Sequence, residues 1–171
     1  MDPMDTAPLG TAYRTLLDAA ATVAGAGAPG PVPPPGEWDA DHILAHVSVL
    51  TATTLVTVST VASGAGATYD NRGALDEWNL DRTIARAGGG EGLPERIRRQ
   101  AEALCAAGAA LSEPELDTPV PTLLLSHGAL MLDRPMPLRD LLTGLAEAEL
   151  PGHTTQLLSL LPQEASARPG A

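Results

Sequence analysis

An acid and a histidine, Glu149 and His153, stand four residues apart near the end of the chain. At about 100° per residue, this spacing places both on one face of a helix, where they can bind the same ion. They interrupt a mostly apolar stripe of Leu138, Leu142, Leu145, Glu149, His153, Gln156 and Leu160. A carboxylate in such a stripe points toward the core, where an unpaired charge is costly. The pair therefore predicts a partner, and an acid one turn from an imidazole indicates a metal ion.

A third ligand is available from a second pair at the same spacing, His42 and His46. His46 lies about 60° from the centre of its apolar helix face and His42 about 100° away, so His46 is the inward residue. Two imidazoles and one carboxylate with an open position form the ligand set of a catalytic zinc site. We therefore predict a metal site of His46, Glu149 and His153, the alternative being a satisfied hydrogen bond in the core.

Two competing sites are weaker. His42 with His46 alone lacks an evident third ligand, and the role of His42 stays open. A hydrolase built from Ser126, His127 and Asp133 is disfavoured because these residues lie close in sequence and no nucleophile elbow is present.

Composition limits the class of protein. A chain of 171 residues that is 44% apolar suits one domain with a real core, and without Phe that core must be Leu, Val and Ala, which favours helix. The net charge of −11 argues against nucleic acid and anionic membranes as partners. We expect small-molecule partners, and a homodimer is left open.

The compartment expected is the cytoplasm. The single cysteine, Cys105, cannot form an intramolecular disulfide, and its Ala-rich surroundings predict a buried helical thiol rather than a reactive one. Residues 1–6 lack the basic and apolar regions of a secretory signal. Residues 47–68 carry no charge, but Ser and Thr interrupt them, which favours a buried or half-buried helix over a membrane span.

The pattern of apolar residues predicts an all-α fold, a four-helix bundle with a short polar helical insertion, in a single domain over 1–171 with its core at about 6–162. Main helices are expected at 6–24, 38–63, 93–111 and 138–161, the insertion at 70–86, a stiff Pro/Gly linker at 25–36 and a flexible tail at 163–171. Residues 123–132, around Ser126-His127-Gly128, predict a short hairpin or an apolar lid, and the role of those three residues stays unexplained.

Pro151 lies between the two proposed ligands of the last helix. An interior proline removes one hydrogen bond and clashes with the preceding turn. The leucine phase nevertheless continues on both sides of it, so we predict a kink rather than a break.

The segment 37–47, EWDADHILAHV, resembles the start of helix two in the DinB-like superfamily, in particular the branch of the mycothiol-dependent maleylpyruvate isomerase N-terminal domain. In that branch a tryptophan precedes a helix with a Leu-small-His-apolar motif, whose histidine falls on His46. Its Glu-x-x-x-His pair falls on Glu149 and His153, and the wider His-x-x-Gln pattern reaches Gln156. The resemblance covers about residues 6–162.

The resemblance implies a four-helix bundle with one divalent metal, zinc in this branch and nickel or another ion elsewhere, held by His46, Glu149 and His153. It also implies a low-molecular-weight thiol such as mycothiol, used for S-transfer to, or isomerisation of, a small electrophile, with metal-bound thiol or water as nucleophile. Asn79 and Arg82 would contact the substrate or the thiol, unless they form an ordinary exposed helix face.

The isomerase carries a C-terminal domain that contributes to its site, and this chain ends soon after the metal helix. We therefore expect a substrate other than maleylpyruvate. The alternative to an enzyme is a non-catalytic metal- or ligand-binding helical bundle.

Overall fold

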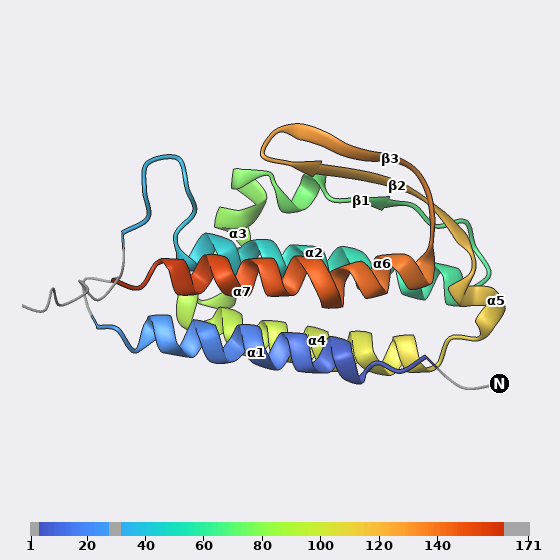
Figure 1. The fold of residues 1–171 in the computed structure, drawn as a ribbon, viewed down its shortest axis with the longest axis horizontal. Helices are drawn as coiled ribbons and strands as arrows, with labels where there is room; N and C mark the ends of the chain where they lie inside the picture. Colours follow the sequence, from blue (N-terminus) through green and yellow to red (C-terminus); the bar gives the residue numbers. More distant parts are fainter. Residues whose placement is uncertain (1–3, 28–31, 163–171) are drawn as a thin grey trace, which may run out of the picture.

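Long helices that lie alongside one another make up most of the protein (Figure 1), and a computed structural model describes them over residues 4–27 and 32–162. The tail predicted at 163–171 and the middle of the linker predicted at 25–36 lie outside the described residues. The α-helices are α1 (Ala7–Ala24), α2 (Ala40–Ala62), α3 (Glu77–Ala87), α4 (Leu93–Ala109), α5 (Glu113–Leu116), α6 (Leu138–Gly144) and α7 (Leu150–Ser159). The predicted main helices therefore form, with ends that differ by one or two residues.

Helix α2 carries a large share of the buried residues. Asp39 begins it by accepting the backbone N–H of His42 at 2.9 Å, as an N-cap acid does. Thr51 Oγ1 donates to the carbonyl four residues earlier at 2.7 Å, and Thr54 Oγ1 does the same at 2.9 Å. Bonds of this kind satisfy the hydroxyls inside the core, so a helix rich in Thr can be buried. By length and composition α2 could cross a membrane, but 61% of its most apolar window is buried inside this fold.

The last helix runs through Pro151 without a break, as predicted, but a π-helical turn rather than a simple kink accommodates the proline. A single π-helical turn, η3 (Leu145–Glu149), joins α6 to α7, and Leu150 N–H donates to the carbonyl five residues earlier, Leu145. The wider turn inserts one extra residue ahead of the proline.

This extra residue changes which side chains face the core. The buried stripe runs from Leu145 to Leu150, Thr154 and Leu157, instead of continuing to the residue at 149. The predicted apolar stripe through Glu149 and His153 is therefore wrong after the π turn. Both positions flank the buried stripe.

A small sheet corrects the predicted all-α class: the protein is mostly helical, and three of its described segments form strands. These are β1 (Tyr69–Asp70), β2 (Pro119–Ser126) and β3 (Ala129–Pro137), in the order β1-β2-β3, with β1 parallel and β3 antiparallel to β2. The sheet lies on the α2 side of the helices (Figure 1). Strand β3 is its outer edge and exposes Leu130 and Met131.

The hairpin predicted around residues 123–132 forms, with a two-residue turn at His127 and Gly128. Their φ angles of 49° and 75° are the positive values that a tight antiparallel hairpin requires. Ser126-His127-Gly128 thus has a structural explanation as a turn.

The polar insertion is not the single helix predicted at 70–86. Asn71 exchanges two hydrogen bonds with the main chain of Leu125, at 2.8 and 2.9 Å, which draws the start of the insertion into the sheet. A 3-10 turn, η1 (Arg72–Ala74), follows, and Asp76 then caps α3 by accepting the N–H of Asn79. A second 3-10 turn, η2 (Gly90–Gly92), leads into α4.

Candidate metal centre

The three residues predicted as ligands come together between α2 and the last helix. One ligand atom from each of His46, Glu149 and His153 lies within 4.8 Å of the other two. The two imidazole rings meet edge to face, with their centroids 4.6 Å apart. Residues more than a hundred positions apart in sequence therefore present their donors to one point.

The ring of His46 is held in one tautomer. Its Nδ1 lies 2.6 Å from the backbone carbonyl of Ala74, in η1. A carbonyl oxygen only accepts, so Nδ1 carries the proton and Nε2 keeps a lone pair for another partner. Burial lowers the pKa of His46 to about 4, with the nearby His153 lowering it further, so the ring is neutral at pH 7. His46 is thus ready to bind a cation through Nε2.

His153 is oriented in the same way by a different group. Its Nδ1 donates to Oε1 of Gln156, one turn along α7, at 3.0 Å. Its Nε2 is buried and has no hydrogen-bond partner within the described residues. Glu149 Oε2 is 3.7 Å from that nitrogen, which is beyond hydrogen-bond distance. A buried nitrogen without a hydrogen-bond partner is costly, and this nitrogen lies close to the ligand atoms of His46 and Glu149.

Glu149 closes the group from the solvent side. Because it is the last residue of the π turn, its side chain lies beside the core stripe and is 53% exposed. The interaction with the His153 ring lowers the pKa of Glu149 against the opposing effect of burial. The carboxylate is therefore charged at neutral pH and open to solvent on one side.

An aromatic residue borders the group. Trp38 packs on His46 with ring centroids 5.0 Å apart. Tyr69, in β1, is buried, and burial raises its pKa to about 12, with a smaller contribution from the charge of Glu149. Sequence analysis missed Tyr69 and the carbonyl of Ala74, because their places depend on how the insertion folds and no local motif marks them.

His42, which we ranked below His46, lies in a separate cluster. Its Nδ1 is 2.8 Å from Asp39 Oδ1 and its Nε2 is 3.0 Å from Asp81 Oδ1. Partial burial opposes charging of the ring, but the hydrogen bonds from Asp39 and Asp81 raise the pKa of His42. Both of its nitrogens are occupied, so His42 is not placed to bind the same ion.

The two tentative substrate contacts have other partners. Asn79 Nδ2 donates to the carbonyl of Gly73 at 3.1 Å, which braces the turn that carries Ala74. Arg82 is exposed and its guanidinium lies 4.9 Å from the ring centroid of Trp78. Asn79 therefore stabilises the turn whose Ala74 carbonyl bonds to His46. No described contact joins Arg82 to the candidate metal centre.

The weaker hydrolase candidate does not assemble. Ser126 Oγ and His127 Nδ1 lie 3.0 Å apart at the hairpin turn, but the third member, Asp133, pairs with Leu123, three residues away along β2 from Ser126. Three residues of strand span about 10 Å. This distance is too long for a proton relay.

The donor set fits a divalent metal ion. Two imidazoles and one carboxylate are ligands that zinc and nickel accept, and each histidine is held at its Nδ1, as metal-binding histidines usually are. The unpartnered Nε2 of His153 is the observation that a plain hydrogen-bonded core does not explain.

Comparison of the chain with protein-family models, with curated proteins and with solved structures gives no significant match. The resemblance to the DinB-like superfamily therefore stays a prediction that rests on the motif residues.

Proposed function

We propose that this protein is a metal-dependent enzyme of the DinB-like group, which holds one divalent ion through His46, Glu149 and His153 and uses a low-molecular-weight thiol. The observation that carries the proposal is the convergence of two free ε nitrogens and a carboxylate within 4.8 Å. Zinc is the ion we expect, with nickel as the alternative. The long helices α1, α2 and α4 and the last helix, from α6 to α7, lie side by side (Figure 1), which supports the bundle that the resemblance implies.

The reaction we propose is S-transfer to a small electrophile, or isomerisation through a transient thiol adduct, with a mycothiol-like thiol as co-substrate. A divalent ion in this site would lower the pKa of a bound thiol, so that the thiolate is present at neutral pH. Glu149 contributes one negative charge and leaves the solvent side of the site approachable.

The surrounding residues keep the ligands in order. Ala74 and Gln156 fix which nitrogen of each ring is free. Trp38 packs against His46. Such supports limit how far the ligand side chains can rotate.

The first test is elemental analysis of the purified protein. We expect about one equivalent of zinc or nickel per chain, and little in His46→Ala. Absence of stoichiometric metal, or equal metal in the variant, would contradict the site.

Activity needs a separate test. The protein is incubated with mycothiol and a model electrophile such as 1-chloro-2,4-dinitrobenzene, and the thiol adduct is followed by mass spectrometry. We expect Glu149→Gln to slow adduct formation, whereas Glu147→Gln, an exposed acid on the same π turn, leaves it unchanged. Equal turnover in both variants would remove the catalytic role.

One observation favours a non-catalytic metal-binding role as the second candidate. Two surface clefts, one between α1 and α4 and one between α1 and α7, include none of the three proposed ligands. Full metal content with no thiol adduct for any electrophile would favour this second reading.

A further inference from the structure

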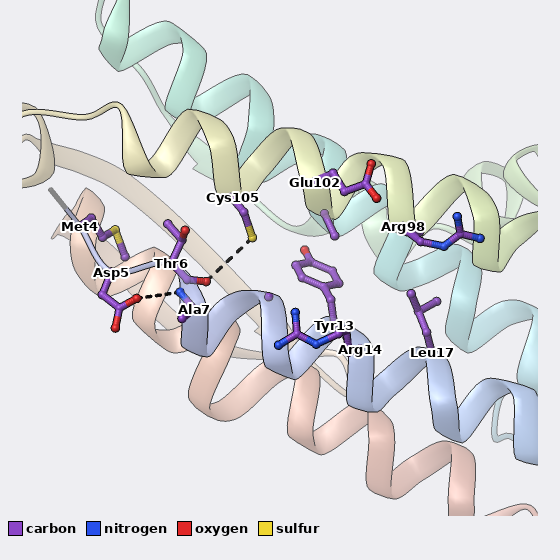
Figure 2. A pocket seen from close by; sticks show the side chains of 12 residues that line it. Met4, Asp5, Thr6, Ala7, Tyr13, Arg14, Leu17, Arg98, Glu102 and Cys105 are labelled. Carbon is purple, nitrogen blue, oxygen red and sulfur yellow. Dashed lines mark hydrogen bonds between the residues drawn. The ribbon is translucent and has the colours of Figure 1, made fainter.

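We propose that the cleft between α1 and α4 binds a small organic carboxylate with an apolar body, at a site separate from the candidate metal centre. The cleft has a volume of about 750 Å³ and is shown in Figure 2. Small-molecule sites commonly occupy about 300–1,000 Å³. The proposed metal ligands come from α2, η3 and α7, so this site does not depend on the proposed enzymatic function.

The hollow exists because small residues face it from both helices. A Cβ added at Gly10 of α1 would make only ordinary contacts, 3.4 Å from Arg14 Nη1 and 3.8 Å from Cys105 Sγ, so both groups lie close to the α1 backbone at this point. Ala101 is its small counterpart on α4. A bulkier pair at these positions would fill the space.

The floor of the cleft is apolar although it includes a phenol. Tyr13 Oη hydrogen-bonds to Thr51 Oγ1 of α2 at 2.7 Å, so its polar atom is satisfied beneath the cleft. Its ring stands between α1 and α4 in Figure 2, with Leu17 further along α1. This surface suits the apolar part of a ligand.

Arg14 supplies the cation that would recognise a carboxylate. Its Nη2 donates to a neutral group, Thr11 Oγ1, at 2.8 Å, and no ion pair within the described residues joins it to an acid. Four other described arginines are by contrast paired with acids: Arg98 and Arg99, for example, share Glu95. A guanidinium in this state keeps donors for a bidentate carboxylate contact.

The charge around the cleft limits the ligand further. Asp5 and Glu102 also line it, so both signs are present. Asp5 accepts the N–H of Ala7 at 2.9 Å and so begins α1, while Glu102 is on the α4 wall in Figure 2. Two acids near one available cation disfavour a polyanion. A molecule with a single carboxylate and an apolar body fits better than a phosphate ester.

The lone cysteine provides a reporter inside the cleft. Cys105 is on helix α4, as predicted, but it is half-buried rather than buried, with Sγ facing the Thr6 carbonyl at 4.0 Å. Burial raises the pKa of the Cys105 thiol, and the charge of Arg14 opposes this shift. Alkylation by iodoacetamide at about pH 8.5 therefore reads access to this one position.

The experiment measures the alkylation rate of Cys105 against the concentration of octanoate. We expect saturable protection in the wild-type protein, equal protection in His46→Ala, and no protection by octanol, which has the same tail and no charge. Arg14→Gln should need roughly tenfold more octanoate, with Arg14→Lys in between. Arg72→Gln, a distant exposed arginine paired with Asp70, is the matched control and should behave as wild type.

Three results would overturn the proposal. These are no saturable protection by octanoate, equal protection in Arg14→Gln, or protection by octanol as strong as by octanoate. Circular dichroism melting of each variant, with isothermal titration of octanoate as a second measure of binding, separates a lost contact from a lost fold.

Discussion

Two histidine clusters start from one helix, a single turn apart, and end in opposite chemical states. His42 lies between the carboxylates of Asp39 and Asp81, at 2.8 and 3.0 Å, and both of its nitrogens are occupied. His46 gives one nitrogen to a backbone carbonyl and turns the other toward His153. Both ring nitrogens of His42 have carboxylate partners, whereas the second cluster leaves Nε2 of His153 without a hydrogen-bond partner among the described residues.

The difference shows that partners, more than residue type, decide what a histidine can do. Acids around His42 raise its pKa, whereas burial lowers the pKa of His46 to about 4. A neutral ring with a free nitrogen can bind a metal, whereas carboxylates on both sides of a ring stabilise its charged form.

The largest effect expected is on metal affinity. His46→Gln should weaken zinc binding at least about a hundredfold because it removes one of three ligands, while His42→Gln should change it less than about twofold. Competition with a chromophoric chelator measures both. An equal loss of zinc affinity in the two variants would mean that His42 takes part in metal binding as much as His46 does.

Acid should destabilise the metal-free protein through His46. The unfolded chain takes up this proton near pH 6.5, and the folded protein only near pH 4. Between these values the unfolded state binds more protons, so stability falls as the pH falls. We expect a loss of about 3 kcal/mol across this window.

Urea denaturation at several pH values, with chelator present, measures this loss. The acid-dependent part should be missing from His46→Gln, whatever the overall stability of that variant. Parallel pH curves for the two proteins would mean that His46 is not a buried neutral ring.

A smaller effect is expected at the residue behind His153. Gln156→Leu removes the acceptor that holds Nδ1, so the ring can change tautomer and rotate. Loss of such a support typically weakens metal binding by 10–100-fold, and we expect about tenfold. The same chelator competition measures it, with Thr155→Ala on the exposed side of α7 as the control. An unchanged affinity would show that His153 is oriented by packing alone.

The smallest effect expected belongs to His42. Its folded pKa is raised above the ordinary value of 6.5, so its contribution to stability is complete below about pH 6.5 and is lost as the pH rises through the folded pKa. Wild type should therefore exceed His42→Gln in stability more at about pH 5.5 than at pH 9. Thermal melts at both values test this. A difference that grows toward high pH would reverse the assignment of the two clusters.

The ligands could be predicted from sequence because their spacing follows helix periodicity on each side of the site. The insertion could not, because residues 70–86 carry helical spacing throughout while the Asn71 side chain bonds to β2, more than fifty residues away. The hairpin could be predicted because its turn residues are adjacent in sequence, whereas the pairing of β2 with the distant β1 could not. Helix periodicity also does not predict the hydrogen bond between His46 and the carbonyl of Ala74.

The π turn is the instructive failure. A fixed 100° step places Glu149 in the core, and the structure places it at the surface, because one extra residue ahead of Pro151 resets the phase. The three ligands still meet because Glu149 ends the π turn and His153 comes after it, so the spacing between these two residues is unchanged. Spacing within the pair was therefore predictable, and the direction of the pair relative to the leucines before it was not.

The outer edge of the sheet has a consequence for handling the protein at high concentration. Strand β3 offers unpaired main-chain groups, and along its second half Asp133, Arg134 and Pro135 act as gatekeepers against intermolecular strand pairing. Its first half has no such protection, and Leu130 and Met131 are 59% and 66% exposed. Met131→Lys should therefore improve solubility without a change in melting temperature, because it interrupts this short exposed apolar segment.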